Sequence, residues 1–178
     1  LSRELSLHCY DCCPAPMFGR SKGIGLGMSN SEQSYRPAGR LVPVFGANDH
    51  IDTAPLTLSL AKSGAASGET VLLVDCQNGN IMDQAGVIYN KTLADVLFRN
   101  ADIQDAQYVT SNEHFTLMSA GDACLSTVLG TLAAISLDFD WVFVGAPSGC
   151  SPSHVRLAGA ADMSLLTYDS ASDHFMRA

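Results

Sequence analysis

The chain has 178 residues and a mass of 18.8 kDa, and 47% of its residues are hydrophobic, which suits one domain with a sizeable core. It contains no run of 18 or more apolar residues, so a membrane-spanning helix is excluded, and its first seven residues are too few for a signal peptide. Eighteen acidic against ten basic residues give a net charge of -8, which repels DNA phosphates. We therefore expect a protein of the cytoplasm that does not bind nucleic acid directly.

Residues 1–39 are expected to form a poorly structured leader, because prolines, glycines and serines interrupt any helical or strand period. Three of the six cysteines, Cys9, Cys12 and Cys13, lie close together in this leader. Cys9 and Cys12 have the spacing of half a zinc site, but no second Cys or His pair follows at a fitting distance. A thiol-rich leader with reduced cysteines is the favoured interpretation.

From residue 41 onward, short apolar runs alternate with helical patterns, which is typical of parallel strands joined by crossover helices. The apolar runs predict strands over residues 41–45, 71–76, 115–119, 141–144 and 163–168. The periodic segments predict helices over 53–63, 92–99 and 123–136, and another that begins near Pro152. The expected fold is a doubly wound α/β domain over residues 40–178, with a mainly parallel sheet.

The turn after the first predicted strand is where such a fold binds ligands. Compared with the phosphate-loop pattern G-x-x-x-x-G-K-[ST], this turn keeps the first glycine, Gly46, and the final threonine, Thr53. Ile51 replaces the second glycine, and Asp52 replaces the lysine. The two residues most important for holding phosphates are therefore absent, and Asp52 reverses the charge at the lysine position.

Five further motifs follow in order and at fitting intervals: Val-Leu-Leu-Val-Asp at 71–75, Thr-Leu-Ala-Asp-Val-Leu at 92–97, Asp-Ile-Gln-Asp-Ala at 102–106, Phe-Thr-Leu-Met-Ser-Ala-Gly at 115–121, and Phe-Asp-Trp-Val-Phe-Val-Gly-Ala-Pro-Ser-Gly at 139–149. As an ordered set they resemble the MinD/ParA family of deviant Walker ATPases, which have a P-loop NTPase-like α/β fold. The stretch 151–177 looks most like the branch of the flagellar-number regulator FlhG.

The resemblance implies which catalytic groups have been lost. The family's signature lysine follows the first glycine of the loop, where this chain has Ala47, and its Asp-x-Pro motif corresponds to Gly145-Ala146-Pro147. The strand-ending carboxylate of the family matches Asp75, which is the candidate catalytic residue. Because both lysines and one carboxylate are missing, we expect a pseudo-ATPase with no cofactor.

Structural explanations compete with functional ones at the remaining candidate residues. Asp52 precedes Thr-Ala-Pro and is expected to act as a helix N-cap rather than as a ligand contact. Thr53 is expected to start a helix, and would bind magnesium only if Mg-ATP binds. Asp75 would cap the turn that follows it if it is not catalytic. If a nucleotide does bind, Gly46, Asn48, Asp52 and Thr53 are its expected contacts.

The favoured functional hypothesis is a catalytically degenerate MinD/ParA-like protein that binds protein partners as a spatial regulator or scaffold, for example in flagellar placement. It would act as a homodimer or heterodimer, and its partners would recruit it to a cell pole or membrane. One alternative is a divergent ATP-binding switch with slow hydrolysis. Another is a localisation factor of pilus assembly, similar to TadZ and CpaE. Relatives continue beyond the position of Ala178, so we expect a shortened chain or a fragment.

Overall fold

The computed structural model describes residues 39–48, 50–110 and 114–168, all of which belong to the unit Tyr35–Ala178. The leader predicted for residues 1–39, with Cys9, Cys12 and Cys13, lies outside the described residues except for Gly39. The strands and helices predicted from the sequence all begin within the described part of the chain.

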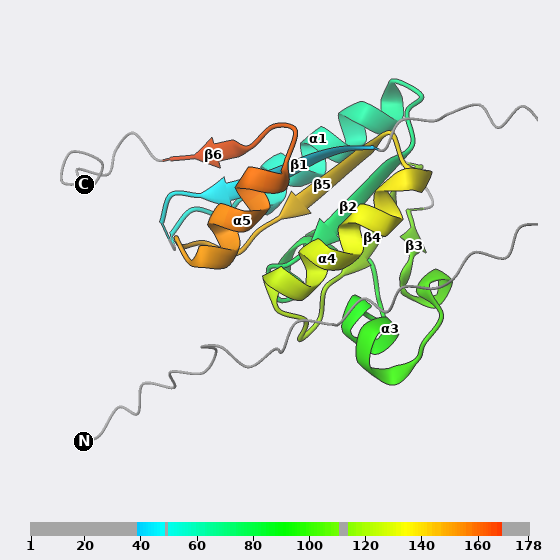
Figure 1. The fold of residues 1–178 in the computed structure, drawn as a ribbon. Helices are drawn as coiled ribbons and strands as arrows, with labels where there is room; N and C mark the ends of the chain where they lie inside the picture. The colour runs from blue at the N-terminus through cyan, green and yellow to red at the C-terminus, as the bar shows by residue number, and fades with distance from the viewer. Residues whose placement is uncertain (1–38, 49, 111–113, 169–178) are drawn as a thin grey trace, which may run out of the picture. The chain divides into compact units, whose positions relative to one another are not determined.

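The described residues form a six-stranded sheet with strand order β3-β4-β2-β5-β1-β6 (Figure 1). Every pair of neighbours is parallel except β3 and β4, which are antiparallel. The prediction of a mainly parallel α/β sheet is therefore confirmed. The strands are β1 (Arg40–Gly46), β2 (Val71–Asp75), β3 (Tyr108–Val109), β4 (Thr116–Ser119), β5 (Trp141–Gly145) and β6 (Leu165–Thr167).

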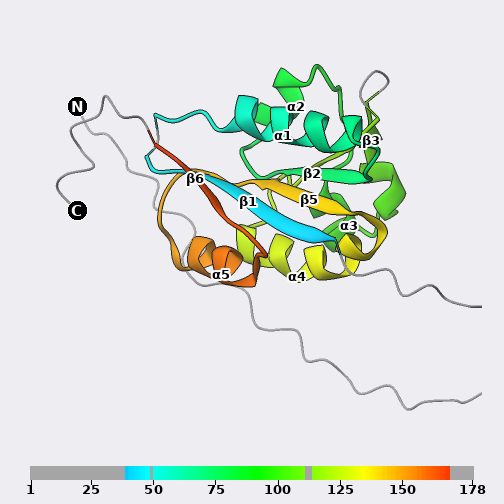
Figure 2. The same cartoon turned by 90° about the horizontal axis from the view of Figure 1, so that it is seen from above.

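Helices cover both faces of this sheet (Figure 2). On one face lie α1 (Ala54–Ala66) and α2 (Asn80–Gln84), and on the other lie α3 (Leu93–Arg99), α4 (Leu125–Ile135) and α5 (Pro152–Ala160). Two short 3-10 helices, η1 (Ile103–Ala106) and η2 (Ser136–Asp138), complete the secondary structure of the described residues.

The core consists of two apolar layers, one on each face, because side chains alternate along a strand. In β2, Leu72 and Val74 face the layer of α4 and α5, whereas Val71 and Leu73 face the layer of α1 and α2. The stripe predicted on residues 123–136 is confirmed as core, since Val128 and Leu132 are buried and Leu125 and Leu129 pack against them.

The differences from the predicted elements are local. The strand expected over 163–168 comprises only Leu165–Thr167, and helix α1 begins at Ala54 rather than at residue 53. Helix α2 and strand β3 were not predicted, because five and two residues are too few to show a period. Helix α2 is important for the site described below.

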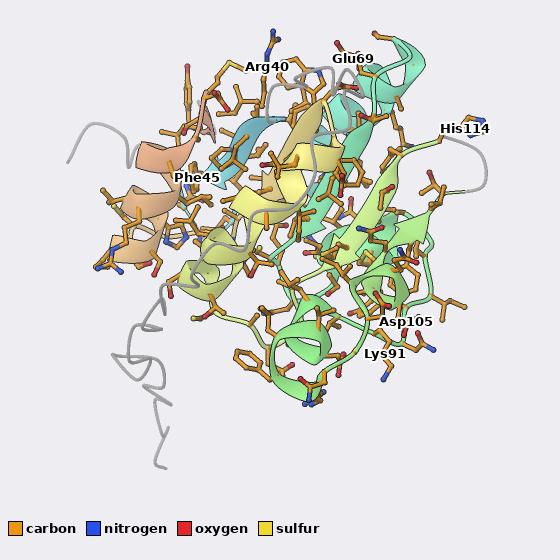
Figure 3. The ribbon with its side chains drawn as sticks, turned by 45° about the vertical axis from the view of Figure 1, so that its right-hand side comes forward. Arg40, Phe45, Glu69, Lys91, Asp105 and His114 are labelled. Atoms are coloured by element: carbon orange, nitrogen blue, oxygen red, sulfur yellow. The ribbon has the colours of Figure 1, made fainter. Side chains whose placement is uncertain are left out.

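Aromatic and charged side chains contact one another at the amino edge of the sheet. The guanidinium of Arg40 lies 4.8 Å from the ring centroid of Trp141, and Glu69 accepts a hydrogen bond from the Trp141 indole. Figure 3 shows Arg40 and Glu69 at the same end of the molecule. The opposite, carboxyl edge carries the loops in which the sequence places the candidate site.

Candidate functional site

The loop that joins β1 to α1 lies at the carboxyl edge of the sheet, as the sequence predicts. The ends of β1, β2 and β5 meet there, because Val44 pairs with Gly145 and Gly145 pairs with Asp75. A side chain at Gly46 would be tightly packed, because a Cβ atom there would lie 3.2 Å from the carbonyl oxygen of Ile51 and 3.3 Å from the Ser148 hydroxyl. The first glycine of the loop is thus explained by close packing.

Asn48 organises the loop itself. Its side-chain oxygen accepts a hydrogen bond from the N–H of His50 at 3.0 Å, and its carbonyl oxygen accepts one from the N–H of Ile51 at 3.3 Å. This is the local turn that asparagine favours. In this structure Asn48 contacts its own loop, and the His50 side chain is exposed.

Asp52 lies at the start of α1, where its carboxylate accepts three hydrogen bonds. Oδ1 accepts from the N–H of Ala54 at 3.0 Å and from the Asn80 amide at 3.0 Å, and Oδ2 accepts from the Gln84 amide at 2.8 Å. Burial of the carboxylate opposes ionisation, but these three bonds together lower the pKa of Asp52 below its ordinary value. Asp52 is therefore a carboxylate tied both to α1 and to α2.

The expectation that Asp52 is the N-cap residue of this helix needs a correction. The N-cap position belongs to Thr53, whose own side chain makes no capping bond, and Pro55 is in the first turn. Asp52 precedes it by one residue, but its carboxylate still accepts from the N–H of Ala54. The capping interaction is made by the predicted residue, Asp52, which lies one position before the N-cap.

Thr53 is buried, with 2% of its surface exposed, and its hydroxyl oxygen accepts a hydrogen bond from the side-chain amide of Gln77. The same amide nitrogen donates to the carbonyl oxygen of Ala146 at 3.0 Å. Gln77 therefore links the segments that follow β1, β2 and β5. The Thr53 hydroxyl oxygen, which would bind magnesium if Mg-ATP bound, is therefore already paired with an amide donor.

Asp75 is also buried, with 1% of its surface exposed, at the end of β2. Its Oδ1 accepts from the N–H of Gln77 at 2.7 Å, and its Oδ2 accepts from the N–H groups of Ile81 and Met82 at 2.9 and 3.1 Å. Burial raises the pKa of this carboxyl above its ordinary value, although the backbone donors act in the opposite direction. Oδ2 of the candidate catalytic carboxylate thus holds the first turn of α2 in place, and Oδ1 holds the turn at Gln77 that precedes it.

At Gly145, a side chain would enter space that is already filled. A Cβ atom there would overlap Cδ1 of Ile81, which is fully buried, and would lie 3.6 Å from the Gln77 amide nitrogen. The absence of the carboxylate that the resemblance predicts at this position is therefore accompanied by a neighbour that fills its place.

A cleft of about 320 Å³ opens at this edge of the sheet. Its walls come from the loop after β1, the segment after β2 and the segment after β5, and its lining residues are His50, Ile51, Asp52, Gln77, Asn78, Asn80, Pro147 and Ser148. None of these is a lysine or an arginine. Among residues 39–48, 50–110 and 114–168, no group of three or more metal-ligating side chains is found.

These residues do not fit Mg-ATP. Phosphate groups need N–H donors and cationic side chains, but the Ala54 N–H and the Asn80 and Gln84 amides already donate to Asp52. The Thr53 hydroxyl oxygen already accepts from Gln77, and the carboxylate of Asp52 occupies the start of α1.

The structure brings together four of the predicted residues, namely Gly46, Asn48, Asp52 and Thr53, because they belong to one loop. Asp75 lies at the end of the strand next to β5 and joins them through Gln77. Sequence reasoning missed Gln77, Asn80, Gln84 and Ile81. The available signal was the cluster of amide side chains directly after β2, which is unusual at the end of a buried strand.

The described architecture, with its parallel sheet and loop at the carboxyl edge, is the α/β fold of P-loop ATPases of the MinD type. Comparisons with protein-family models and with curated proteins give no match. Solved structures do match. The chimeric protein CapA2B2 superimposes with a TM-score of 0.67 at 13% identity, over 78% of this chain and 66% of that one.

Two further structures show the same likeness. The septum site-determining protein MinD of Pyrococcus horikoshii, complexed with Mg-ADP, has a TM-score of 0.64 at 22% identity, over 72% of this chain and 57% of that one. The kinase domain of the Escherichia coli tyrosine kinase ETK has a TM-score of 0.60 at 20% identity, over 72% and 55%. The present chain spans less than two thirds of each of these structures. At such identities the likeness establishes the fold, which hosts more than one activity.

No helix among the described residues is long and apolar enough to cross a membrane.

Proposed function

We propose that this protein is a catalytically degenerate member of the MinD/ParA family that acts by binding protein partners, as a spatial regulator or scaffold, without an ATP cycle. The observation that carries the proposal is the carboxylate of Asp52 at the start of α1. It accepts hydrogen bonds from Ala54, Asn80 and Gln84, and so uses three donors that could otherwise bind a phosphate group.

The positions of Thr53 and Gly145 support the same proposal. In a working site of this kind, a threonine hydroxyl and a nearby carboxylate help to hold magnesium on the phosphates. Here Gln77 donates to the Thr53 hydroxyl, and Ile81 fills the space beside Gly145. Three separate changes therefore act in the same direction, which is the loss of phosphoryl-transfer chemistry.

A role in positioning is suggested by the similar structures rather than by the site. One of them is a septum site-determining protein, and another is a cell division ATPase from Pyrococcus furiosus, both named MinD. Flagellar placement is the narrower form of the proposal. It rests on the resemblance of residues 151–177 to the FlhG branch, of which residues 169–177 lie outside the described chain.

The proposal is tested by the mass of the full chain in solution, measured by light scattering after size exclusion, with and without Mg-ATP. In the family that the sequence resembles, dimers form across bound ATP. We expect the same mass in both conditions. A dimer that appears only with Mg-ATP would overturn the proposal and favour a slow ATP-binding switch.

A second experiment tests the partner-binding role directly. The tagged chain is used to capture proteins from its source cells in the presence of Mg-ATP or of apyrase, which removes ATP. The proposal predicts the same specific partners in equal amounts under both conditions. Partners that are lost on apyrase treatment, or the absence of any specific partner, would contradict it.

A further inference from the structure

Several hydrogen-bond donors beside the cleft already bond to other groups of the protein. Three side-chain amides near Asp52 donate to protein oxygens. Gln77 donates to Thr53 and Ala146, Asn80 donates to Asp52 and Gln77, and Gln84 donates to Asp52 and Asn80. The backbone N–H of Ala54 does the same. These four groups are therefore engaged within the protein.

Oxygen acceptors remain available on the same walls. Oδ2 of Asp52 accepts one hydrogen bond, from Gln84, and a carboxylate oxygen can accept a second. The side chains of Asn78 and Ser148 also line the cleft, and no hydrogen bond to either side-chain oxygen is present within the described residues. The Asn78 amide and the Ser148 hydroxyl can donate as well as accept, so the group that distinguishes between ligands is the carboxylate of Asp52, which accepts only and suits a cationic donor.

The charge of the cleft also favours a cationic ligand. Within the described part of the chain, Asp52 forms no ion pair, and no lysine or arginine lines the cleft. Asp52 is exposed at the mouth, so its charge reaches solvent. The chain as a whole carries a net charge of -8, which attracts basic partners over several ångströms.

The size of the cleft limits what can enter. At about 320 Å³ it is at the lower end of the range for ligand pockets, roughly 300–1,000 Å³. A single long side chain fits this range better than a nucleotide does.

We propose that this cleft receives a basic side chain, the guanidinium of an arginine presented by a partner protein, which donates hydrogen bonds to Asp52 and its neighbours. The planar guanidinium can donate two parallel hydrogen bonds to a carboxylate, and its remaining N–H groups can donate to other oxygens of the lining, of which Asn78 and Ser148 carry one each in their side chains. This inference rests on the proposed function, because it assigns the chemistry of the partner to the site that has lost its phosphates.

The test is a titration of the uniformly ¹⁵N-labelled full chain with N-acetyl-L-arginine amide, followed by NMR. N-acetyl-L-citrulline amide, in which a neutral urea replaces the guanidinium, is the matched ligand control. We expect saturable shifts of the Ala54 N–H and of the Asn80 and Gln84 side-chain amides with the arginine compound, and at least about fivefold weaker binding of the citrulline compound. Equal binding of both compounds, or no shift of these signals, would overturn the inference.

Two variants sharpen the experiment. Asp52→Asn keeps an acceptor for the Ala54 N–H but removes the charge, so the arginine compound should bind roughly threefold to fivefold more weakly. Asp105→Asn makes the same change in η1, outside the cleft lining, and should bind as the unmodified protein does (Figure 3). If Asp52→Asn binds as tightly as the unmodified protein, Asp52 is not the receptor and the inference is wrong.

A third titration, with sodium triphosphate, separates this inference from the proposed function. Shifts of the same signals with triphosphate would show a working phosphate site and contradict both. No shift with either triphosphate or the arginine compound would overturn only the inference that the cleft binds a basic side chain. The proposal of a degenerate phosphate site would stand.

Discussion

The side chain of Ile81 fills the space in which a side chain at Gly145 would have to lie. A Cβ atom at Gly145 would overlap Cδ1 of Ile81, whereas Cγ1 of Ile81 would be at an ordinary contact distance of 3.5 Å. Gly145 is the position at which the resemblance predicts a carboxylate, so the glycine and the isoleucine are two parts of one local arrangement.

A double-mutant cycle measures this relationship. Gly145→Ala alone should lower the free energy of unfolding by about 1–3 kcal/mol, because an extra methyl group overfills a closed site. In the Ile81→Val variant, which lacks Cδ1, the same Gly145→Ala change should lower the free energy of unfolding clearly less. The measurement is urea unfolding of the four proteins.

Gly130→Ala is the control for the glycine replacement. It lies exposed in α4 with open space around it, so alanine there should be neutral or stabilise the protein by up to about 1 kcal/mol. Additive effects of Gly145→Ala and Ile81→Val would show that the two side chains do not compete for space.

Asp75 should contribute to stability through its backbone contacts. In Asp75→Asn, the amide group can accept with one oxygen only, so N–H donors of Gln77, Ile81 or Met82 lose their partner. We expect a loss of about 2 kcal/mol or more in the free energy of unfolding. Asp83→Asn, an exposed change in the same short helix, should stay within about 0.5 kcal/mol of the unmodified protein. An unchanged free energy of unfolding in Asp75→Asn would mean that these hydrogen bonds do not contribute to stability.

Asp95 should make the fold sensitive to acid. Its carboxylate accepts from Arg99 at 2.6 Å and from the N–H and hydroxyl of Thr92 at 2.8 and 2.9 Å, and these bonds lower its pKa from 3.8 to about 2. A depressed folded-state pKa gives stability that is present above pH 3.8 and is lost as the pH falls toward 2.

The matching experiment follows the urea midpoint as the pH is lowered through this range. The midpoint of Asp95→Asn should fall less steeply on acidification than that of the unmodified protein. Asp105→Asn, for which no comparable contacts exist in the described structure, should keep the steep fall. Parallel curves for Asp95→Asn and the unmodified protein would contradict the assignment.

Two cysteines should differ strongly in reactivity. Cys124 precedes α4, with its sulfur 3.1 Å from the Ser126 hydroxyl and 2.9 Å from the Thr127 hydroxyl; partial burial opposes ionisation, but these bonds lower its pKa to about 7. Burial and the neighbouring Asp75 charge raise the pKa of Cys76 to about 12. Iodoacetamide at neutral pH should therefore modify Cys124 at least about tenfold faster than Cys76. Peptide mass spectrometry resolves the two sites, and equal rates would refute this ordering.

The sequence predicted most of the sheet because buried parallel strands are continuous apolar runs, such as Val71–Asp75. It also placed Gly46 and Thr53 in one loop, since a turn after the first strand is a local feature. The interactions that define the site are not local. Gln77 meets Thr53 across 24 positions of the chain, and no spacing rule reports such a pairing.

The structure also changes how strongly the Asp52 carboxylate is expected to repel a bound phosphate. A bare carboxylate in place of a lysine would cost a bound phosphate on the order of 4 kcal/mol at 4 Å and an effective dielectric near 20. Asp52 is exposed and accepts three hydrogen bonds, so solvent and these donors weaken its repulsion. The loss of free donors, rather than repulsion alone, is the stronger reason to expect poor phosphate binding.

Asp52→Lys alone should not restore hydrolysis. The variant removes the negative charge and frees the Asn80 and Gln84 amides, so weak nucleotide binding is expected to appear. Phosphate release should stay at background, because Gln77 still donates to Thr53 and Ile81 still fills the space beside Gly145. Turnover in this single variant would show that the loop lysine was the one missing part.

The central claim is tested most directly by calorimetric titration of Mg-ATP into the unmodified full chain, combined with an assay of phosphate release. We predict no saturable heat at micromolar nucleotide and no release above background, because Asp52 engages the Ala54 N–H at the start of α1 and the Asn80 and Gln84 amides of α2. Micromolar binding together with turnover would contradict the account and identify a divergent ATP switch instead.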